Sequence, residues 1–216
     1  MPTTTRTAVS VRQLRSGDER NFVYVLVDGP SREAMVIDCG GEVDPILSVV
    51  KEEGLEVRFA VATHHHSDHT ATIWQLSQLL DAKIVAFKGS PLVHDVSVVD
   101  REILHVGATA VKVLHTPGHT EDSICLYDGR NLFSGDTVLI GSCGRTDMPG
   151  GSARKMYRSI QTVILRLPGG TMVYPGHETY EVASRTLSEE MKQNPALSAK
   201  SYAEYLRRCK GDYTRP

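Results

Sequence analysis

One short run, residues 63–69, constrains this chain more than any other. Four imidazoles and one carboxylate stand together there, in the order His64-His65-His66-Ser67-Asp68-His69. The run follows an apolar stretch at 57–62, which predicts a strand, and it precedes a helical pattern. In an extended chain, residues i and i+2 point to the same side, so His64 and His66 can bind one ion while His65 points away. The run therefore predicts a metal site where a strand ends.

The chemistry of the run supports the same interpretation. Neutral imidazole and carboxylate together suit zinc, iron, manganese or nickel. The alternative is a solvated polar loop that binds nothing. Such a loop needs no fixed alternation of histidines, so we favour the metal site. We expect Asp68 and His69 to follow in a tight loop as a second set of ligands.

Three later turns repeat one pattern, in which an apolar strand runs into a glycine-containing turn and then a metal-binding side chain. His119 stands in Thr116-Pro117-Gly118-His119-Thr120, Asp136 in Phe133-Ser134-Gly135-Asp136-Thr137, and His177 in Val173-Tyr174-Pro175-Gly176-His177-Glu178. Glycine lets the backbone bend sharply at such a point. Because loops at one edge of a sheet converge, we expect these three side chains to join the histidine run.

Short apolar runs separated by turn residues predict the remaining elements. We expect strands at 22–27, 34–37, 57–62, 83–87, 111–114, 123–127, 131–134 and 171–174. We expect helices at about 44–53, 71–80, 153–167, 182–193 and 198–209. Hairpins give antiparallel pairs and helical crossovers give parallel ones, so the fold class is α/β, with a mixed sheet or two sheets covered by helices. Residues 1–216 are expected to form a single domain with a short helical C-terminal segment at about 182–216.

Composition excludes several classes of protein. Lys and Arg number 24 against 26 Asp and Glu, a formal net charge of -2, which argues against a general nucleic-acid binder. No apolar run is long enough to span a bilayer, and the first residues lack the apolar core of a secretory signal. The four cysteines form no Cys-x-x-Cys pair. We therefore expect a cytoplasmic protein with free thiols and no membrane or nucleic-acid partner, and a homodimer stays open.

Taken together, the motifs resemble the metallo-β-lactamase-fold superfamily. The signature is His64-x-His66-x-Asp68-His69, followed in order by His119, Asp136 and His177. The resemblance implies an αββα sandwich, in which two mixed β-sheets pack face to face with helices outside. It also implies two ions, the first held by His64, His66 and His119 and the second by Asp68, His69 and His177, with Asp136 between them.

A narrower resemblance concerns the reaction. A bridging Asp136 in place of a cysteine ligand is similar to the hydroxyacylglutathione hydrolases, or glyoxalase II. The segment Gly144-Arg145-Thr146-Asp147 is similar both to compact glyoxalase-II-like proteins and to persulfide dioxygenases. Gly176-His177-Glu178 is nearer to the hydrolases. The C-terminal part, however, is short compared with full-length glyoxalase II.

The leading hypothesis is a metal-dependent hydrolase of thioesters. Two divalent ions, zinc in preference to iron or manganese, would lower the pKa of a shared water, and the resulting hydroxide would attack the thioester carbonyl. Asp68 and Asp136 would orient that hydroxide as the catalytic carboxylates. The partner would be a small-molecule substrate, a thioester or a glutathione-type thiol. Arg145 would either bind a carboxylate of this substrate or pair with Asp147.

The alternative belongs to a different reaction class, an iron-dependent persulfide dioxygenase. The resemblance then implies one Fe(II), held by His64, His119 and Asp136. The same ligands serve both hypotheses, so the ligand set does not separate them. A binding module without catalysis is a third class, which the complete ligand set disfavours.

Overall fold

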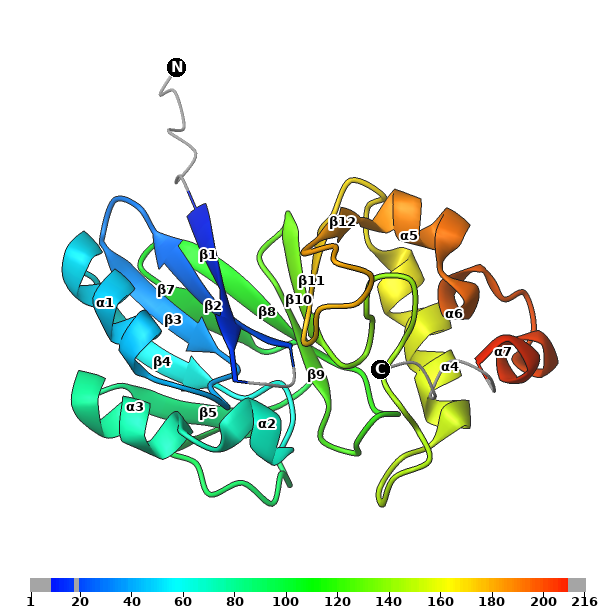
Figure 1. Cartoon of the computed structure of the whole chain (residues 1–216), viewed down its shortest axis with the longest axis horizontal. Coiled ribbons are helices and arrows are strands. Elements are labelled where there is room, and N and C mark those ends of the chain that lie inside the picture. Colours follow the sequence, from blue (N-terminus) through cyan, green and yellow to red (C-terminus); the bar gives the residue numbers. More distant parts are fainter. Residues whose placement is uncertain (1–8, 18–19, 210–216) are drawn as a thin grey trace.

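Two six-stranded sheets pack face to face in the computed structural model, which describes residues 9–17 and 20–209. Helices cover the outer face of each sheet, α1 and α3 on one side and α4 to α7 on the other (Figure 1). This arrangement confirms the predicted αββα sandwich of two mixed sheets.

The first sheet has its strands in chain order. They are β1 (Val9–Ser16), β2 (Asn21–Asp28), β3 (Glu33–Ile37), β4 (Glu56–Val61), β5 (Lys83–Phe87) and β6 (Val96–Val98). Pairing is antiparallel from β1 to β3 and parallel from β3 to β6. The parallel connections carry α1 (Asp44–Glu53), α2 (Ser67–Thr70) and α3 (Ile73–Leu80).

The second sheet reads in the reverse order, from β12 to β7. Its strands are β7 (Ile103–Val106), β8 (Thr109–His115), β9 (Ile124–Tyr127), β10 (Asn131–Gly135), β11 (Met172–Pro175) and β12 (Arg185–Thr186). Only β10 and β11 pair in parallel, and α4 (Ala153–Thr162) with the 3-10 turn η1 (Ile164–Arg166) connects them. The chain then continues through α5 (Leu187–Gln193), α6 (Pro195–Ser198) and α7 (Tyr202–Cys209).

Strand β2 shows why both faces of the first sheet are covered. All eight of its residues are buried. Phe22, Tyr24 and Leu26 belong to the core between the two sheets, whereas Val23 and Val25 pack under the helices on the outer face. Because successive side chains of a strand point to opposite faces, a strand that is apolar throughout requires a layer on each side.

Each predicted strand is present to within about two residues, but three helical predictions need correction. The helix predicted to reach 167 ends at Thr162, where β-branched Thr162 and Val163 lower helix propensity. The helix predicted from 182 begins only at Leu187, because Thr186 and Glu189 form a capping box there. The helix predicted from 198 begins at Tyr202, after the separate turn α6.

Other features were not predicted, or lie outside the described residues. The strands β1, β6, β7 and β12 had no prediction, and residues 210–216 of the expected C-terminal segment are not among those described. All four cysteines are free, as expected, and all four are buried. Within residues 9–17 and 20–209, no helix has the length and apolarity needed to cross a membrane.

Main-chain hydrogen bonds tie the two sheets together at one edge. Ile124 N donates to Thr63 O at 2.8 Å, and Phe22 N donates to Gly176 O at 2.8 Å. Each bond joins a segment of the first sheet to a segment of the second. This edge therefore has a fixed geometry, and the predicted metal-binding turns meet there.

Candidate metal centre

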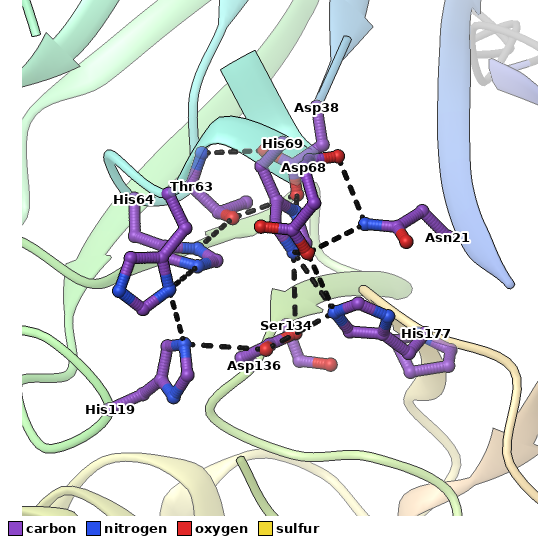
Figure 2. Close-up of polar contacts among 12 residues, drawn as sticks. Asn21, Asp38, Thr63, His64, Asp68, His69, His119, Ser134, Asp136 and His177 are labelled. Atoms are coloured by element: carbon purple, nitrogen blue, oxygen red, sulfur yellow. Dashed lines mark hydrogen bonds and ion pairs between the residues drawn. The ribbon is translucent and has the colours of Figure 1, made fainter. Parts of the chain in front are cut away.

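The seven predicted ligands converge at this edge, and most of them are labelled in Figure 2. The first sheet supplies four, from the end of β4 and from α2, and the second supplies three, from the loops after β8, β10 and β11. Their donor atoms form three overlapping clusters, each within 4.8 Å: His64, His66 and His119; His64, His69 and Asp136; and Asp68, His69 and His177. That these residues bind metal stays a prediction.

In the first cluster, three ring nitrogens face one another. His66 Nδ1 lies 3.1 Å from His64 Nε2 and 2.9 Å from His119 Nε2. Imidazole nitrogens that converge in this way offer lone pairs to one point, which is the arrangement that a cation requires.

The cluster of Asp68, His69 and His177 also brings ring nitrogens close together, and it adds a carboxylate. His69 Nε2 lies 3.2 Å from His177 Nε2, which lies 3.3 Å from Asp68 Oδ2. Asp68 and His69 stand in the one-turn helix α2, where we had expected a tight loop. The helix begins directly after His66, so both side chains still face the histidine run.

Asp136 stands between the cluster of His64, His66 and His119 and the cluster of Asp68, His69 and His177. Its Oδ2 lies 3.4 Å from both His119 Nε2 and His177 Nε2, whereas its Oδ1 is buried with no hydrogen-bond partner among the described residues. A Cβ on Gly176 would overlap Asp136 Oδ1, so this close approach requires glycine. A buried carboxylate oxygen without a donor is costly unless a cation satisfies it. These residues therefore fit a metal ion.

The carboxylate of Asp38 orients two of the imidazoles. Asp38 Oδ2 accepts from His69 Nδ1 at 3.0 Å and from Thr63 Oγ1 at 2.8 Å, and Thr63 Oγ1 lies 3.2 Å from His64 Nδ1. Because the threonine hydroxyl is already donating, it accepts from His64. Both rings thus carry their proton on Nδ1 and present a bare Nε2 to the site. Asp38 acts as a hydrogen-bond acceptor and belongs to none of the three clusters.

His119 is oriented through the backbone of Arg145. His119 Nδ1 donates to the Arg145 carbonyl at 2.7 Å, which leaves its Nε2 bare. The Arg145 guanidinium forms a two-point ion pair with Asp147, at 3.0 and 3.1 Å. That pair is the structural alternative considered above, and the binding of substrate by Arg145 stays a prediction.

His65 points away from the clusters, as the alternation predicted. Its Nδ1 donates to Asp122 Oδ1 at 2.7 Å, and Asp122 Oδ2 accepts from Ser90 Oγ at 2.6 Å. This network was not predicted, because Ser90 and Asp122 lie far from the histidine run in the chain.

Electrostatics at the site favour bound cations. Burial holds the pKa of His64 well below its usual value, so its ring is neutral. Burial alone would raise the pKa of Asp136, but the neighbouring histidines, His177 first, hold it well below its usual value. Burial would lower the pKa of His177, yet the carboxylates Asp136 and Asp68 raise it to about 11. The carboxylates therefore stay ionised and attract positive charge.

Asn21 is a residue of the site that was not predicted. Asn21, at the start of β2, donates through Nδ2 to the backbone carbonyl of Asp68 at 2.9 Å and to Asp68 Oδ2 at 3.0 Å. A single asparagine after a turn resembles many ordinary turn residues. Only the fold places it against α2.

The motifs and the fold agree with a family model. The model for the metallo-beta-lactamase superfamily matches residues 17–94 and 86–177, which together contain all seven candidate ligands. The chain belongs to the metallo-beta-lactamase superfamily. The predicted family resemblance is thereby confirmed.

Similar proteins within the superfamily include ones with two different named activities. The human mitochondrial persulfide dioxygenase ETHE1 is 34% identical over 194 residues, covering 88% of this chain and 76% of the human protein. A probable hydroxyacylglutathione hydrolase of Schizosaccharomyces pombe is 31% identical over 192 residues, covering 84% and 73%. The crystal structure of ETHE1 from Myxococcus xanthus superposes with a TM-score of 0.89 at 32% identity, covering 96% and 92%.

Proposed function

We propose that this superfamily member is a persulfide dioxygenase that uses a single ferrous ion. The observation that carries the proposal is the similarity to Myxococcus xanthus ETHE1, which extends over 96% of this chain and 92% of that one. Human ETHE1, a persulfide dioxygenase, is also more similar in sequence than the fission-yeast hydrolase. The relatives thus favour the alternative hypothesis over the hydrolase that we expected first.

The ligand chemistry supports the same proposal. His64, His119 and Asp136 offer two imidazoles and one carboxylate, the set that non-haem iron oxygenases use. A ferrous ion bound there would supply the oxygen chemistry.

The protein's own contribution is orientation. Thr63 and the Arg145 carbonyl hold the Nδ1 protons of His64 and His119, so each presents a bare Nε2 to the site. Asp136 adds the negative charge. Burial of His64 and Asp136 keeps bulk water from these donors.

A thioester hydrolase is the second candidate, and one observation favours it. The cluster of Asp68, His69 and His177 offers three ligand atoms for a second ion. A two-metal hydrolase would use this second site, whereas a one-iron dioxygenase would not. The Asp68 carboxylate would then help to orient an attacking hydroxide, together with Asp136.

Metal analysis paired with an oxygen electrode separates the two candidates. Protein purified without added metal should contain one iron per chain and should consume oxygen with glutathione persulfide. In Asp68→Ala the iron should remain, and activity should fall by about 10–100-fold, the usual effect of losing a group that supports ligands. Two zinc ions per chain, with one lost in Asp68→Ala and thioester hydrolysis without oxygen uptake, would instead establish the hydrolase.

A further inference from the structure

Two fully buried polar side chains lie in the C-terminal helical segment, Glu190 and Asn194. Glu190 belongs to α5 and Asn194 stands between α5 and α6, in the helical layer outside the second sheet (Figure 1). Both residues are 0% exposed. Burial of a carboxylate and an amide is costly unless their polar atoms are hydrogen-bonded, so their partners show what the two side chains hold in place.

Several of these partners belong to one tight turn in the loop after β10. Glu190 Oε2 accepts from Gly141 N at 2.8 Å. Asn194 Nδ2 lies 3.0 Å from Leu139 O and 2.8 Å from Ser142 O. The backbones of Leu139 and Ser142 also pair with each other, which closes the turn. Glu190 and Asn194 therefore fix this turn, here called the Gly141 turn.

The remaining polar atoms of the pair are also satisfied. Glu190 Oε1 accepts from Arg185 Nη1 at 2.9 Å, and Glu190 Oε2 lies 2.8 Å from Asn194 Nδ2. Asn194 Oδ1 accepts from Ala196 N at 2.9 Å, at the start of α6. A buried polar network with all its members satisfied is rigid, so the Gly141 turn has a rigid support.

The chain that leaves the Gly141 turn passes directly behind two candidate ligands, His119 and Asp136. Gly144 N donates to Asp136 O at 2.8 Å. A Cβ on Gly144 would come within 2.2 Å of Asp136 O and 3.0 Å of His119 Nδ1. The next residue, Arg145, supplies the carbonyl that accepts from His119 Nδ1. A shift of the Gly141 turn would therefore move the backbone that supports both ligands.

The same turn contacts the loop of a third candidate ligand, His177. Thr179, two residues after His177, donates from Oγ1 to Ile140 O. A Cβ on Gly141 would come within 2.9 Å of the Tyr180 ring. The Gly141 turn thus contacts or leads to the segments that carry all three ligands from the second sheet, which are labelled in Figure 2.

We propose that Glu190 and Asn194 are positioning residues for metal binding, which act through the Gly141 turn. Neither belongs to a ligand cluster, so neither would touch the ion. Their role is to hold the Arg145 carbonyl against His119, and the Gly144 backbone against Asp136. The proposal rests on the candidate metal centre, which the dioxygenase and the hydrolase share, and not on the choice between them.

Binding of Co(II), measured on the full-length protein in competition with a chelator, tests this role. Asn194→Ser keeps a side-chain cap for α6 but is too short to reach the carbonyls of the Gly141 turn. Its Kd for Co(II) should rise about 10-fold, the lower end of the effect of losing a group that orients ligands. At saturating Co(II) its visible absorption bands should also differ from those of the wild type, because the His119 ring is held differently.

A conservative variant and a control separate positioning from a general loss of stability. Glu190→Ala should also raise the Kd about 10-fold. Glu190→Gln should restore most of that affinity, because its amide oxygen can still accept from Gly141 N and Asn194 Nδ2. Asp28→Asn alters hydrogen bonds at the opposite end of β2 from the metal edge. It should unfold at a lower urea concentration, yet its Kd and absorption bands should equal those of the wild type.

The outcomes distinguish this proposal from the proposed function. Wild-type Kd and absorption bands in folded Asn194→Ser and Glu190→Ala would overturn it, and either variant suffices if the other does not fold. An equal loss of affinity in Asp28→Asn would also overturn it. A wild type that binds no Co(II) would sink the metal centre and the positioning role together. If the variants behave as expected but the iron-loaded wild type consumes no oxygen with glutathione persulfide, only the dioxygenase proposal falls.

Discussion

The single carboxylate of Asp38 orients both Thr63 and His69 at the site. Asp38 stands at the end of β3 with φ at 59°, a left-handed conformation that is unfavourable for most residues other than glycine. Its carboxylate accepts from Thr63 N at 2.7 Å, from Thr63 Oγ1 and from His69. Three hydrogen bonds to one carboxylate offset the backbone strain, which typically costs about 1–3 kcal/mol. The strained turn is thus what places an acceptor behind the histidines.

At the same scale, neighbouring histidines should differ sharply in their contribution to metal binding. We expect His64→Ala to lose bound metal and activity, because this ring faces both His66 and the Asp136 cluster. His65→Ala should retain its metal, because that ring faces Asp122. Metal content by elemental analysis, with activity measured on the same samples, checks the pair. Equal metal loss in the two variants would mean that the alternation does not orient the rings.

At the scale of the elements, the buried carboxylate of Asp28 forms hydrogen bonds that connect a turn of the first sheet to the second sheet. Asp28, the last residue of β2, accepts from Ser31 Oγ at 2.7 Å and from Thr109 Oγ1, at the start of β8, at 2.8 Å. Gly107 lies so close that a Cβ there would overlap both Asp28 and Ser31. Burial alone would raise the pKa of Asp28, but the donated hydrogen bonds outweigh it and hold the pKa below 3.8.

Asp28→Asn should therefore lower stability in a pH-dependent manner. The stabilisation from a carboxylate with a lowered pKa is complete above the unfolded-state pKa of about 3.8 and is lost as pH falls through the lower folded-state pKa. We expect the variant to lose about 1–3 kcal/mol at neutral pH, and the gap to shrink in acid. Urea unfolding of both proteins at several pH values measures it. A gap of constant size would show that the charge of Asp28 does not contribute.

An element can be predicted when its own residues carry a clear hydrophobic pattern and are bounded by turn residues. β2 and β4 are visible in the sequence because apolar runs and turn residues mark them. β6 has only three residues, and β12 only two, so neither gives a periodic pattern. The seven candidate ligands could be singled out because they follow the ends of apolar strands. Asn21 and Asp122 could not be, because only tertiary packing brings them to the metal edge.

At the scale of the whole molecule, the candidate metal site takes its residues from both sheets. His64, His66, Asp68 and His69 come from the first, and His119, Asp136 and His177 from the second. An ion bound there would link the two sheets, and it would stabilise the folded state by an amount that rises with the logarithm of the free metal concentration divided by the Kd.

Removal of metal should consequently lower global stability. Protein kept at a free metal concentration about 1,000 times the Kd should be more stable than chelated protein by about 4 kcal/mol. Urea unfolding of chelated and reloaded samples measures the difference. His64→Ala serves as the control and should respond weakly to added metal. A wild-type protein that unfolds at the same urea concentration with and without metal would contradict this role.

The order of the strands also sets the order in which a ribosome delivers the parts of the site. The first sheet is complete at Val98, before Ile103 begins the second. Until the second sheet is made, Phe22, Tyr24 and their apolar neighbours have no opposing layer. Domains acquire structure as they are synthesised, and exposed apolar surface favours aggregation at that stage. The first sheet therefore exposes this apolar face until the second sheet has been synthesised, and the candidate metal site is complete only when His177 has been added.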